Sequence, residues 1–450
     1  MEKQKRSSFS GKLGFVLAAA GSAVGLGNIW RFPYLAAEYG GGIFLLTYLV
    51  LAVTFGFTLL IAEIGIGRKT GLSVAGAFTK LNRKFKFLGY FEALVPIIIL
   101  PYYCVIGGWV TKYMVTFLTG QGVTAASDGF FGAFVGNASE PLLWFSIYLG
   151  ITAIVVLLGV EKGIEKVSKV MMPVLIALSI FIAVYAMMQP GAIEGVKYYL
   201  LPDFTKFSHK TVLAAMGQLF YSMSLAMGIM ITYGSYMKKD VNIESSVRQI
   251  EIFDTGIAIL AGLMIIPAVF IFSGPEGIGA GPSLMFVTLP KVFESMFAGE
   301  IIGGLFFVLV LFAALTSSIS LMETIVSIFM DLFKTSRTKT CVAVLILSVI
   351  LGIPSSLGNG PWAHITIFGM AFLDFFDFIS NSVMMPVAAL ITCIFIGYVV
   401  KPKTIIEEVE TNGAFKSKNL FIVTIKYIAP ICIILILLTS ILSVLGYMNL

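Results

Sequence analysis

Residues 18–33 read AAAGSAVGLGNIWRFP and lie inside the first long apolar run of the chain. Pro33 lacks a backbone N–H and disfavours helix at the residue before it, and each Gly in a helix interior costs about 1 kcal/mol. Asn28 and Arg31 are costly at membrane depth unless they face protein or water. Close helix packing through a GxxxG motif explains the glycines but not these two polar residues. We therefore expect a membrane-spanning helix that unwinds around residues 24–28.

The composition of the whole chain is that of a membrane protein. Of 450 residues, 58% are hydrophobic and only 12% are charged, and the mean hydropathy is +0.97. A soluble protein carries about 25% charged residues, so a soluble enzyme, a nucleic-acid binder and a disordered chain are excluded. Apolar runs of about twenty residues also exclude an outer-membrane barrel, whose strands alternate over about ten residues. The net charge of +6 is then a signal of membrane topology rather than of an anionic partner.

Runs of about 18 or more apolar residues predict eleven membrane-spanning helices. They lie near residues 13–36, 42–67, 88–118, 142–159, 167–187, 212–236, 250–273, 300–333, 340–357, 364–399 and 421–447. The chain is therefore expected to be an all-α polytopic membrane protein. The first run is long enough to span and no small-residue cleavage pattern follows it, so we expect no cleavable signal peptide.

Lys and Arg are concentrated in the N-terminal segment and in every second loop. These segments hold 23 of the 30 basic residues and lie at 1–12, 68–86, 162–169, 238–248, 334–339 and 401–418. The positive-inside rule makes them cytoplasmic, so the N-terminus is expected inside and, after eleven spans, the C-terminus outside. The largest outer loops are then 119–141, 188–211 and 274–299. The last is rich in Gly and Pro, and two interpretations remain open for it: a lid over an outward-facing cavity, or an ordinary connector.

A second polar interruption lies five spans after the first. Residues 217–228, GQLFYSMSLAMG, place two Ser and a Gln in mid-span, with Gly228 about one turn further on. Matching discontinuities in two halves of a chain indicate a binding site at the centre of an inverted-repeat transporter. We therefore expect one transmembrane domain over 1–450. Its repeats would be spans 1–5 and 6–10, about 10–187 and 211–399, followed by an extra helix at about 421–447.

Oxygen-bearing side chains in spans 7 and 8 complete the pattern. Asp254 lies roughly one turn inside the membrane, and an intramembrane acid is a functional candidate by default. Thr316, Ser317 and Ser318 are consecutive hydroxyls in an apolar helix, which back-bonding to the preceding turn explains equally well. Broken helix ends offer N–H groups to a carboxylate and carbonyls to a cation. This set of carbonyls, hydroxyls and a carboxylate suits Na⁺, a hard cation that prefers oxygen ligands.

The remaining chemistry of the chain argues against an enzyme. Because His209 and His364 are its two histidines, neither a His-based metal site nor a Ser–His–Asp triad is expected. The repeated polar rings of an ion channel are not apparent. The thiols are far apart in sequence and in or beside apolar runs, so we expect them to be isolated; they are Cys104, Cys341, Cys393 and Cys432. A ligand-sensing protein that does not transport remains open. A proton-coupled amino-acid permease is the main alternative, although it would not need the polar cluster of Asn28, Asp254, Thr316 and Ser317.

Four motifs resemble those of the neurotransmitter:sodium symporter family. They are GSAVGLGNIWRFPY at 21–34, YY at 102–103, SMSLAMG at 222–228 and LTSS at 315–318. The resemblance runs from about residue 6 to the end of span 10, and eleven spans are similar to a bacterial subgroup. It implies a LeuT-type 5+5 inverted repeat with discontinuous helices 1 and 6. It also implies a sodium-coupled symporter of the bacterial inner membrane that imports an amino acid by alternating access.

The resemblance implies four sets of site residues. One sodium would be bound by the carbonyl of Ala23, the side chains of Asn28, Ser222 and Asp254, and the substrate carboxylate. The second would be bound by carbonyls of Gly21, Val24 and Ala313 and by hydroxyls of Thr316 and Ser317. The substrate would contact Ala23, Leu26, Gly27, Ile99, Tyr103, Tyr221, Ser222, Ser224, Ala226, Met227, Ser318 and Leu321. The gates would be Arg31 with Asp377 outside, and Arg6 with Asp331, Phe9, Ser235 and Tyr236 inside.

Two departures from the family pattern bear on the substrate and the ions. Gly25 stands where monoamine members carry an aspartate, which implies a substrate that brings its own carboxylate. Asp254 stands where many relatives have asparagine, and Ala258 where chloride-independent relatives often have a carboxylate, so we expect Asp254 to replace chloride. The implied pocket is mostly apolar, which favours a neutral, hydrophobic L-amino acid that is aromatic or a bulky aliphatic. Glu63 and Asp374 are expected to pair with backbone groups or helix ends.

Overall fold

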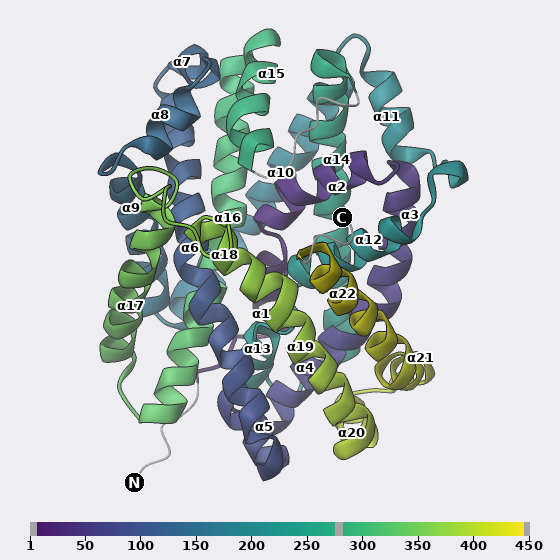
Figure 1. The fold of residues 1–450 in the computed structure, drawn as a ribbon. Coiled ribbons are helices and arrows are strands. Elements are labelled where there is room, and N and C mark those ends of the chain that lie inside the picture. The colour runs from purple at the N-terminus through teal and green to yellow at the C-terminus, as the bar shows by residue number, and fades with distance from the viewer. Residues whose placement is uncertain (1–6, 275–281, 445–450) are drawn as a thin grey trace.

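The computed structural model describes residues 7–274 and 282–444 as a bundle of helices (Figure 1). Within these two ranges β-structure is limited to isolated bridges, Gly41–Pro202 and Ile367–Met370. Nine helices of the described chain are long and apolar enough to cross a membrane, and one bent pair can form a tenth crossing. The expected all-helical membrane fold is therefore confirmed.

The long helices follow one another with short connections. In chain order they are α1 (Lys12–Ala23) with α2 (Phe32–Glu38), α3 (Gly42–Leu51) with α4 (Phe57–Thr70), α6 (Lys86–Leu118), α9 (Glu140–Leu157), α10 (Lys166–Met187), α12 (His209–Ser222) with α13 (Ile229–Tyr236), α14 (Ile243–Ser273), α16 (Gly299–Phe333), α17 (Arg337–Leu357), α18 (Phe372–Asp377) with α19 (Met385–Ile394), and α21 (Lys418–Val423) with α22 (Ala429–Val444). Several pairs are joined by π-helical turns, among them η2 (Ala52–Gly56) and η8 (Phe378–Met384).

The expected spans agree with these helices except in one place. The span expected at 364–399 begins only at Phe372, because Phe368 and Gly369 both adopt positive φ (51° and 80°) that ends regular structure. The span expected at 212–236 is interrupted, as its polar residues predicted. It consists of α12 and α13, of 14 and 8 residues, which is why neither counts as a full crossing by length.

The first break lies in the motif with which the sequence analysis began. Helix α1 ends at Ala23, and the chain resumes as the π-helical turn η1 (Gly27–Arg31) that leads into α2. The two parts are bent by 53°. Val24 and Gly25 are the unwound residues, and Leu26 already has helical backbone angles (φ −56°, ψ −31°), so the break is confirmed but shorter than the expected 24–28. Gly27 and Asn28 already belong to the next helical turn.

The second break separates α12 from α13 over residues 223–228. Ser224 and Ala226 have φ of 53° and 57°, which non-glycine residues rarely adopt, and Gly228 follows at 70°. Such a backbone needs support from its surroundings. The support comes from contacts of α4 and α6, described below.

The break regions lie inside the bundle and the other helices surround them. Helices α6 and α16, which pack on each other, are the most deeply buried crossings. In α9, α10 and α17, less than half of the apolar membrane-spanning stretch is buried inside the protein. Large apolar side chains on these outer helices are exposed, among them Ile154, Val170 and Ile350. Exposed apolar surface of this extent fits contact with lipid.

Short helices gather at the two ends of the bundle (Figure 1). Helices α7 (Gly122–Ala126), α8 (Phe130–Gly136), α11 (Ala192–Leu200) and α15 (Leu289–Ser295) lie at one end, and α5 (Val74–Leu81) and α20 (Lys403–Glu410) at the other. The first group comes from loops expected outside and the second from loops expected in the cytoplasm. At the first end Lys291 pairs with Asp128 and holds the pKa of that exposed carboxyl below its ordinary value.

The Gly/Pro-rich loop is only partly within the described chain. Residues 275–281 lie outside the described residues, and the rest continues as η7 (Leu284–Thr288) and α15. Phe286 of η7 is buried against the aromatic rings of Trp30, Trp109 and Tyr113. This part of the loop is therefore packed on the outer portion of the first broken helix.

Candidate substrate and sodium site

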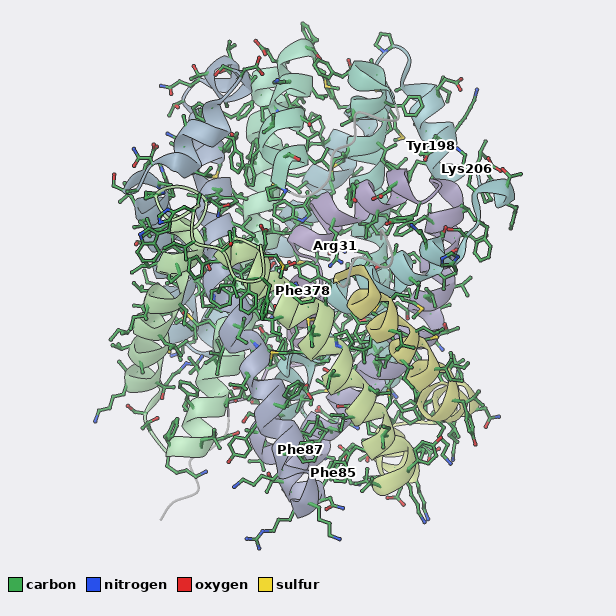
Figure 2. All side chains as sticks on the ribbon, viewed as in Figure 1. Arg31, Phe85, Phe87, Tyr198, Lys206 and Phe378 are labelled. Carbon is green, nitrogen blue, oxygen red and sulfur yellow. The ribbon has the colours of Figure 1, made fainter. Side chains whose placement is uncertain are left out.

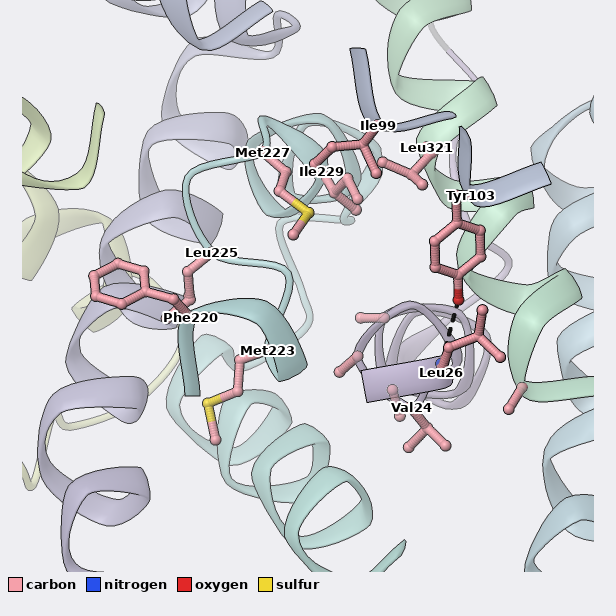
Figure 3. Packing of buried hydrophobic residues seen from close by; sticks show 14 of the residues in the cluster. Val24, Leu26, Ile99, Tyr103, Phe220, Met223, Leu225, Met227, Ile229 and Leu321 are labelled. Atoms are coloured by element: carbon pink, nitrogen blue, oxygen red, sulfur yellow. Dashed lines mark hydrogen bonds between the residues drawn. The ribbon is translucent and has the colours of Figure 1, made fainter. Parts of the chain in front are cut away.

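A small cavity of 30 Å³ lies between the two broken helices (Figure 3). It is lined by Ser22, Ala23, Gly25, Leu26, Gly27, Asn28, Ile99, Tyr103, Tyr221, Ser222, Ser224, Met227, Ile229, Ser317 and Leu321. These residues come from both breaks and from α6 and α16. A volume of this size holds a water molecule but not an amino acid, so a substrate requires the lining side chains to move apart.

Most residues expected to contact the substrate line this cavity, but Ala226 and Ser318 do not. The Ser318 hydroxyl is instead 3.0 Å from both the Tyr148 and Thr152 hydroxyls, on the far side of α16. Ala226 lies in the non-helical part of the break, where helical spacing no longer decides which residues face the cavity. Ser22 and Ile229 also line the cavity and were not predicted as site residues; Ile229 lies immediately after the second break.

Asp254 of α14 joins the two breaks through hydrogen bonds. Its Oδ1 accepts from Asn28 Nδ2 (2.8 Å) and from the Ser222 hydroxyl (2.7 Å), and its Oδ2 accepts from the Tyr48 hydroxyl (3.1 Å). All four side chains are buried, each at most 1% exposed. Three of the four residues expected at the first sodium therefore meet here. Tyr48 was not predicted, because a Tyr in an apolar run is indistinguishable from an ordinary core residue.

Ser317 connects α16 to the first break. Its hydroxyl is 3.1 Å from the Ser22 carbonyl, 3.5 Å from the Val24 carbonyl and 3.2 Å from the Ala313 carbonyl. Thr316 donates to Phe312 and Ala313, so the hydroxyls do back-bond to their own helix as the alternative interpretation held. Gly21 faces Thr316 so closely that an added Cβ would lie 3.1 Å from the Thr316 Cβ. The residues expected at the second sodium are thus grouped between α1 and α16.

The unwound backbone of the first helix is tightly enclosed. The Leu26 N–H donates to the Tyr103 hydroxyl at 3.3 Å, as Figure 3 shows. A Cβ on Gly25 would lie 2.6 Å from the Ser317 Oγ and 3.0 Å from the Tyr103 hydroxyl. One on Gly27 would lie 2.4 Å from the Tyr221 ring. No larger residue fits at either position without displacing a side chain of the cavity.

A larger cavity of 330 Å³ lies on the outer side of the first. Arg31 and Phe378, labelled in Figure 2, both line it. Tyr221 lines both cavities and therefore separates them, with the Arg31 guanidinium 5.4 Å from the centre of its ring. Asp377 accepts a hydrogen bond from Tyr102 at 3.1 Å. It interacts electrostatically with Arg31, but Arg31 and Asp377 form no direct ion pair.

The inner side of the site is packed with aromatic and charged side chains. The Phe9 ring makes edge contacts with Tyr233 and Tyr236 at 5.5 and 6.2 Å, and its N–H donates to the Tyr236 carbonyl. The Tyr236 hydroxyl donates to Glu323 (2.8 Å), which also pairs with Arg337 through both carboxylate oxygens. Glu323 was missed, although an acid in the middle of an apolar span is a usable signal.

The other expected inner contacts are only partly within the described chain. Arg6 lies outside the described residues, so its pairing with Asp331 stays a prediction. Asp331 Oδ2 accepts from the Ser73 N–H at 2.8 Å. The Ser235 hydroxyl donates to the Thr232 carbonyl of its own helix at 2.5 Å. The described residues contain no cluster of three or more His, Cys, Asp or Glu that could hold a metal.

Comparison with known proteins decides the family. The Sodium:neurotransmitter symporter family pattern matches residues 6–125 and 134–449. The chain belongs to this family. The uncharacterized sodium-dependent transporter YhdH of Bacillus subtilis is 36% identical, over 98% of this chain and 99% of that protein. An uncharacterized sodium-dependent transporter of Haemophilus influenzae is 33% identical, over 97% of this chain and 98% of its own length.

A solved structure supports the same assignment. The crystal structure of MhsT in complex with L-phenylalanine matches with a TM-score of 0.88 and 39% identity, covering 97% of this chain and 100% of that one. Membership of the Sodium:neurotransmitter symporter family confirms the family resemblance and the LeuT-type fold expected from the sequence. It makes the protein a multi-pass, sodium-coupled membrane transporter and not an enzyme.

Proposed function

We propose that the protein imports a neutral, hydrophobic L-amino acid together with two sodium ions by alternating access. The chain would form one transport domain of a bacterial inner membrane, with its N-terminus in the cytoplasm and its C-terminus outside. One observation supports this most strongly: Asn28, Ser222 and Asp254 meet at a cavity that both helix breaks line. Breaks of this kind supply free N–H and carbonyl groups in the middle of a membrane.

The first sodium would bind beside Asp254. In the present arrangement the carboxylate is satisfied by three donors, Asn28, Ser222 and Tyr48. An arriving Na⁺ would take the Asn28 amide oxygen, the Ser222 hydroxyl oxygen, the Ala23 carbonyl and the carboxylate as ligands. The substrate carboxylate would complete the shell. Because Asp254 brings a fixed negative charge, the site would not require chloride.

The second sodium would bind between α1 and α16. The Ser317 hydroxyl already bridges carbonyls of both elements. Sodium would take the place of the Ser317 hydroxyl proton as the partner of these carbonyl oxygens. Gly21, Val24, Ala313 and Thr316 would supply the remaining ligands. It would hold the first helix against α16 while the substrate is bound.

The substrate would lie with its carboxylate toward the first break. The Leu26 and Gly27 N–H groups and the Tyr103 hydroxyl would bind the carboxylate, and the side chain would lie against Ile99, Met227 and Leu321. These three residues are apolar, and Met is easily repacked. The related MhsT was solved in complex with L-phenylalanine, which favours an aromatic or a bulky aliphatic side chain here.

During alternating access, the outer and the inner side of the site would open in turn while the other side stays closed. On the outer side Tyr221, with Arg31 above it, separates the two cavities, and the Arg31–Asp377 attraction would tighten this closure. On the inner side Phe9, Tyr236 and Glu323 would separate to release the cargo. The membrane potential would contribute about 2.3 kcal/mol per transported charge per 100 mV.

Uptake into proteoliposomes tests the proposal. Radiolabelled Phe, Tyr, Trp, Leu and Gly are offered with an inward gradient of sodium or of potassium, each with and without chloride. We expect accumulation of the large hydrophobic amino acids that needs sodium and not chloride, and little of Gly. Accumulation driven by a proton gradient without sodium would instead favour a proton-coupled permease of the same architecture.

A further inference from the structure

Two buried glutamates support the second helix break from behind. Glu63 of α4 accepts the Ala226 N–H at 2.7 Å, and Glu92 of α6 accepts the Gly228 N–H at 3.0 Å. Their side chains come from helices that are separated in sequence by α5. The residues are 2% and 1% exposed. Both therefore act on the strained segment whose intermediate residue, Met227, lines the substrate cavity.

The two carboxyl groups bind the same short segment of chain and interact electrostatically. The N–H groups that they accept belong to residues two apart, and two residues span at most about 7 Å of chain. The electrostatic interaction between Glu63 and Glu92 agrees with this closeness. In each carboxyl one oxygen is bonded to the backbone, whereas the other, Oε2, is buried and has no hydrogen-bond partner.

No positive charge balances the pair. Glu63 acts electrostatically on Glu92 and on the Cys393 thiol of α19, and no described Lys or Arg acts on either glutamate. The charged groups of the elements packed around them have other partners: Arg68 pairs with Glu408, Lys69 with Glu407, Lys112 with Glu140, Lys80 with the Thr70 carbonyl, Asp331 with the Ser73 N–H, Glu323 with Arg337, Arg248 with Glu244, and Asp254 with Asn28 and Ser222. Two ionised carboxylates so close in a buried site, with two unsatisfied oxygens, would be strongly unfavourable.

We propose that Glu63 and Glu92 form a proton-binding site, in which the O–H of one free carboxyl oxygen donates to the free oxygen of the other. The proton comes from water and returns to water, and the loaded pair carries one negative charge. It satisfies both orphan oxygens without disturbing the bonds to Ala226 and Gly228. Like-charged carboxylates that share a site hold one proton between them for the same reason.

This site is coupled to the substrate cavity through the backbone. With the proton bound, both N–H groups are fixed and Met227 keeps its place in the cavity. When the proton leaves, two buried charges repel each other, and one glutamate is expected to withdraw from its N–H group. The second break then loses one of its two hydrogen bonds to the glutamates. The position of Met227, and with it the shape of the substrate cavity, therefore changes with the protonation of the pair.

Infrared spectroscopy of the purified, full-length protein tests the proposal. The C=O stretch of a protonated carboxylic acid is followed while the pH is raised from neutral to alkaline values. We expect a band in the wild-type protein that is lost on alkalinisation, and that is absent at neutral pH in Glu92→Gln and in Glu63→Gln. In either variant the new amide N–H satisfies the remaining carboxylate, which then needs no proton.

Glu244→Gln is the matched control. Glu244 is also buried and also accepts backbone N–H groups, from Lys416 and Ser417, but it has Arg248 as its ionic partner. The band should persist in this variant. A wild-type protein without the band, or a band that persists in both Glu63→Gln and Glu92→Gln, would overturn the proposal.

A second measurement avoids dependence on one variant. The thermal midpoint of the wild-type protein should fall as alkaline pH removes the shared proton, whereas that of Glu92→Gln should fall less, because only one carboxyl remains. Equal falls in the two proteins would contradict a shared proton. Neither measurement involves uptake, so a negative result leaves the proposed transport function untouched.

Discussion

At the scale of single residues, Asp254 distinguishes one ion mechanism from another. It is fully buried, and its carboxylate accepts hydrogen bonds from three side chains of three elements. A neutral side chain at this position would keep the shape but remove the negative charge that sodium is proposed to meet. Asp254 is therefore the residue at which sodium binding and chloride independence can be tested together.

We expect Asp254→Asn to weaken the apparent sodium affinity of uptake by about 10- to 100-fold in chloride-free medium. A hydrogen bond or contact to a charged group is worth about 1.5–3 kcal/mol, and 1.4 kcal/mol corresponds to tenfold. Chloride should restore part of the loss by supplying the missing charge. Tyr48→Phe removes one donor and no charge, so it should have a smaller effect. An Asp254→Asn protein with unchanged sodium affinity without chloride would rule out the assigned role.

Gly25 supports a prediction about space rather than charge. A Cβ at this position would lie 2.6 Å from the Ser317 Oγ, so Gly25→Ala must turn that hydroxyl away from the carbonyls of the first break. We expect substrate binding at least about tenfold weaker, a loss of about 1.4 kcal/mol. Gly150→Ala in α9 is the control, because no atom lies within 4 Å of its added Cβ. Equal substrate binding in the two variants, measured by scintillation proximity, would contradict the tight enclosure.

The residues at the breaks could be predicted because polar groups and glycines stand out within apolar runs. Asn28, Ser222 and Asp254 were found in this way, and the structure brings them together. Residues whose type fits an ordinary core, such as Tyr48, carry no such signal. Ala226, which the family resemblance implied as a substrate contact, does not line the cavity, and the side-chain direction in its unwound segment depends on φ angles that no periodicity encodes.

At the scale of elements, one buried ion pair joins α16 to α17 on the inner side of the site. Glu323 is fully buried and pairs with Arg337, which also donates to the Val156 carbonyl. Cys341 lies one turn further along α17, is 1% exposed and interacts electrostatically with the same pair. This native thiol is a reporter of whether the inner side is packed.

We expect Arg337→Ala to destabilise the protein by about 3 kcal/mol and to speed the alkylation of Cys341. Removing one partner of a buried ion pair leaves an uncompensated charge and costs about 3–5 kcal/mol, and the 19% exposure of the Arg337 side chain favours the lower end. Thermal unfolding and mass spectrometry of thiol labelling measure the two effects. Lys339→Ala, an exposed position on the same helix, should change neither. Unchanged labelling of Cys341 in Arg337→Ala would show that the pair does not hold this side closed.

The positions of the long helices followed from hydropathy, whereas their irregular turns did not. Apolar length predicts a crossing, but the six residues between α12 and α13 depend on N–H groups held by Glu63 and Glu92 from other helices. Glu92 was not identified as a site residue, because it lies near the basic segment that precedes span 3. Its partner at the break becomes apparent only in three dimensions.

At the scale of the whole molecule, Tyr221 separates an outer cavity of 330 Å³ from a central one of 30 Å³, while the inner side is packed. The two proposed sodium sites differ in one respect. The substrate carboxylate is proposed as a ligand of the sodium at Asp254, whereas the sodium proposed at Ser317 would only hold α1 against α16. A ligand shared by two cargoes couples their binding directly, because each completes the site of the other.

We therefore expect sodium to strengthen amino-acid binding by about 5- to 150-fold, and the amino acid to strengthen sodium binding by the same factor, as linkage requires. Equilibrium binding of radiolabelled amino acid over a sodium series, with potassium holding the ionic strength constant, measures this coupling. Asp254→Asn should abolish most of it, because the shared ligand loses its ion. Ser317→Ala should weaken sodium binding but leave more of the coupling. If the two variants lose coupling equally, the substrate carboxylate is not a sodium ligand, and the two ions act only through the conformation of the first helix.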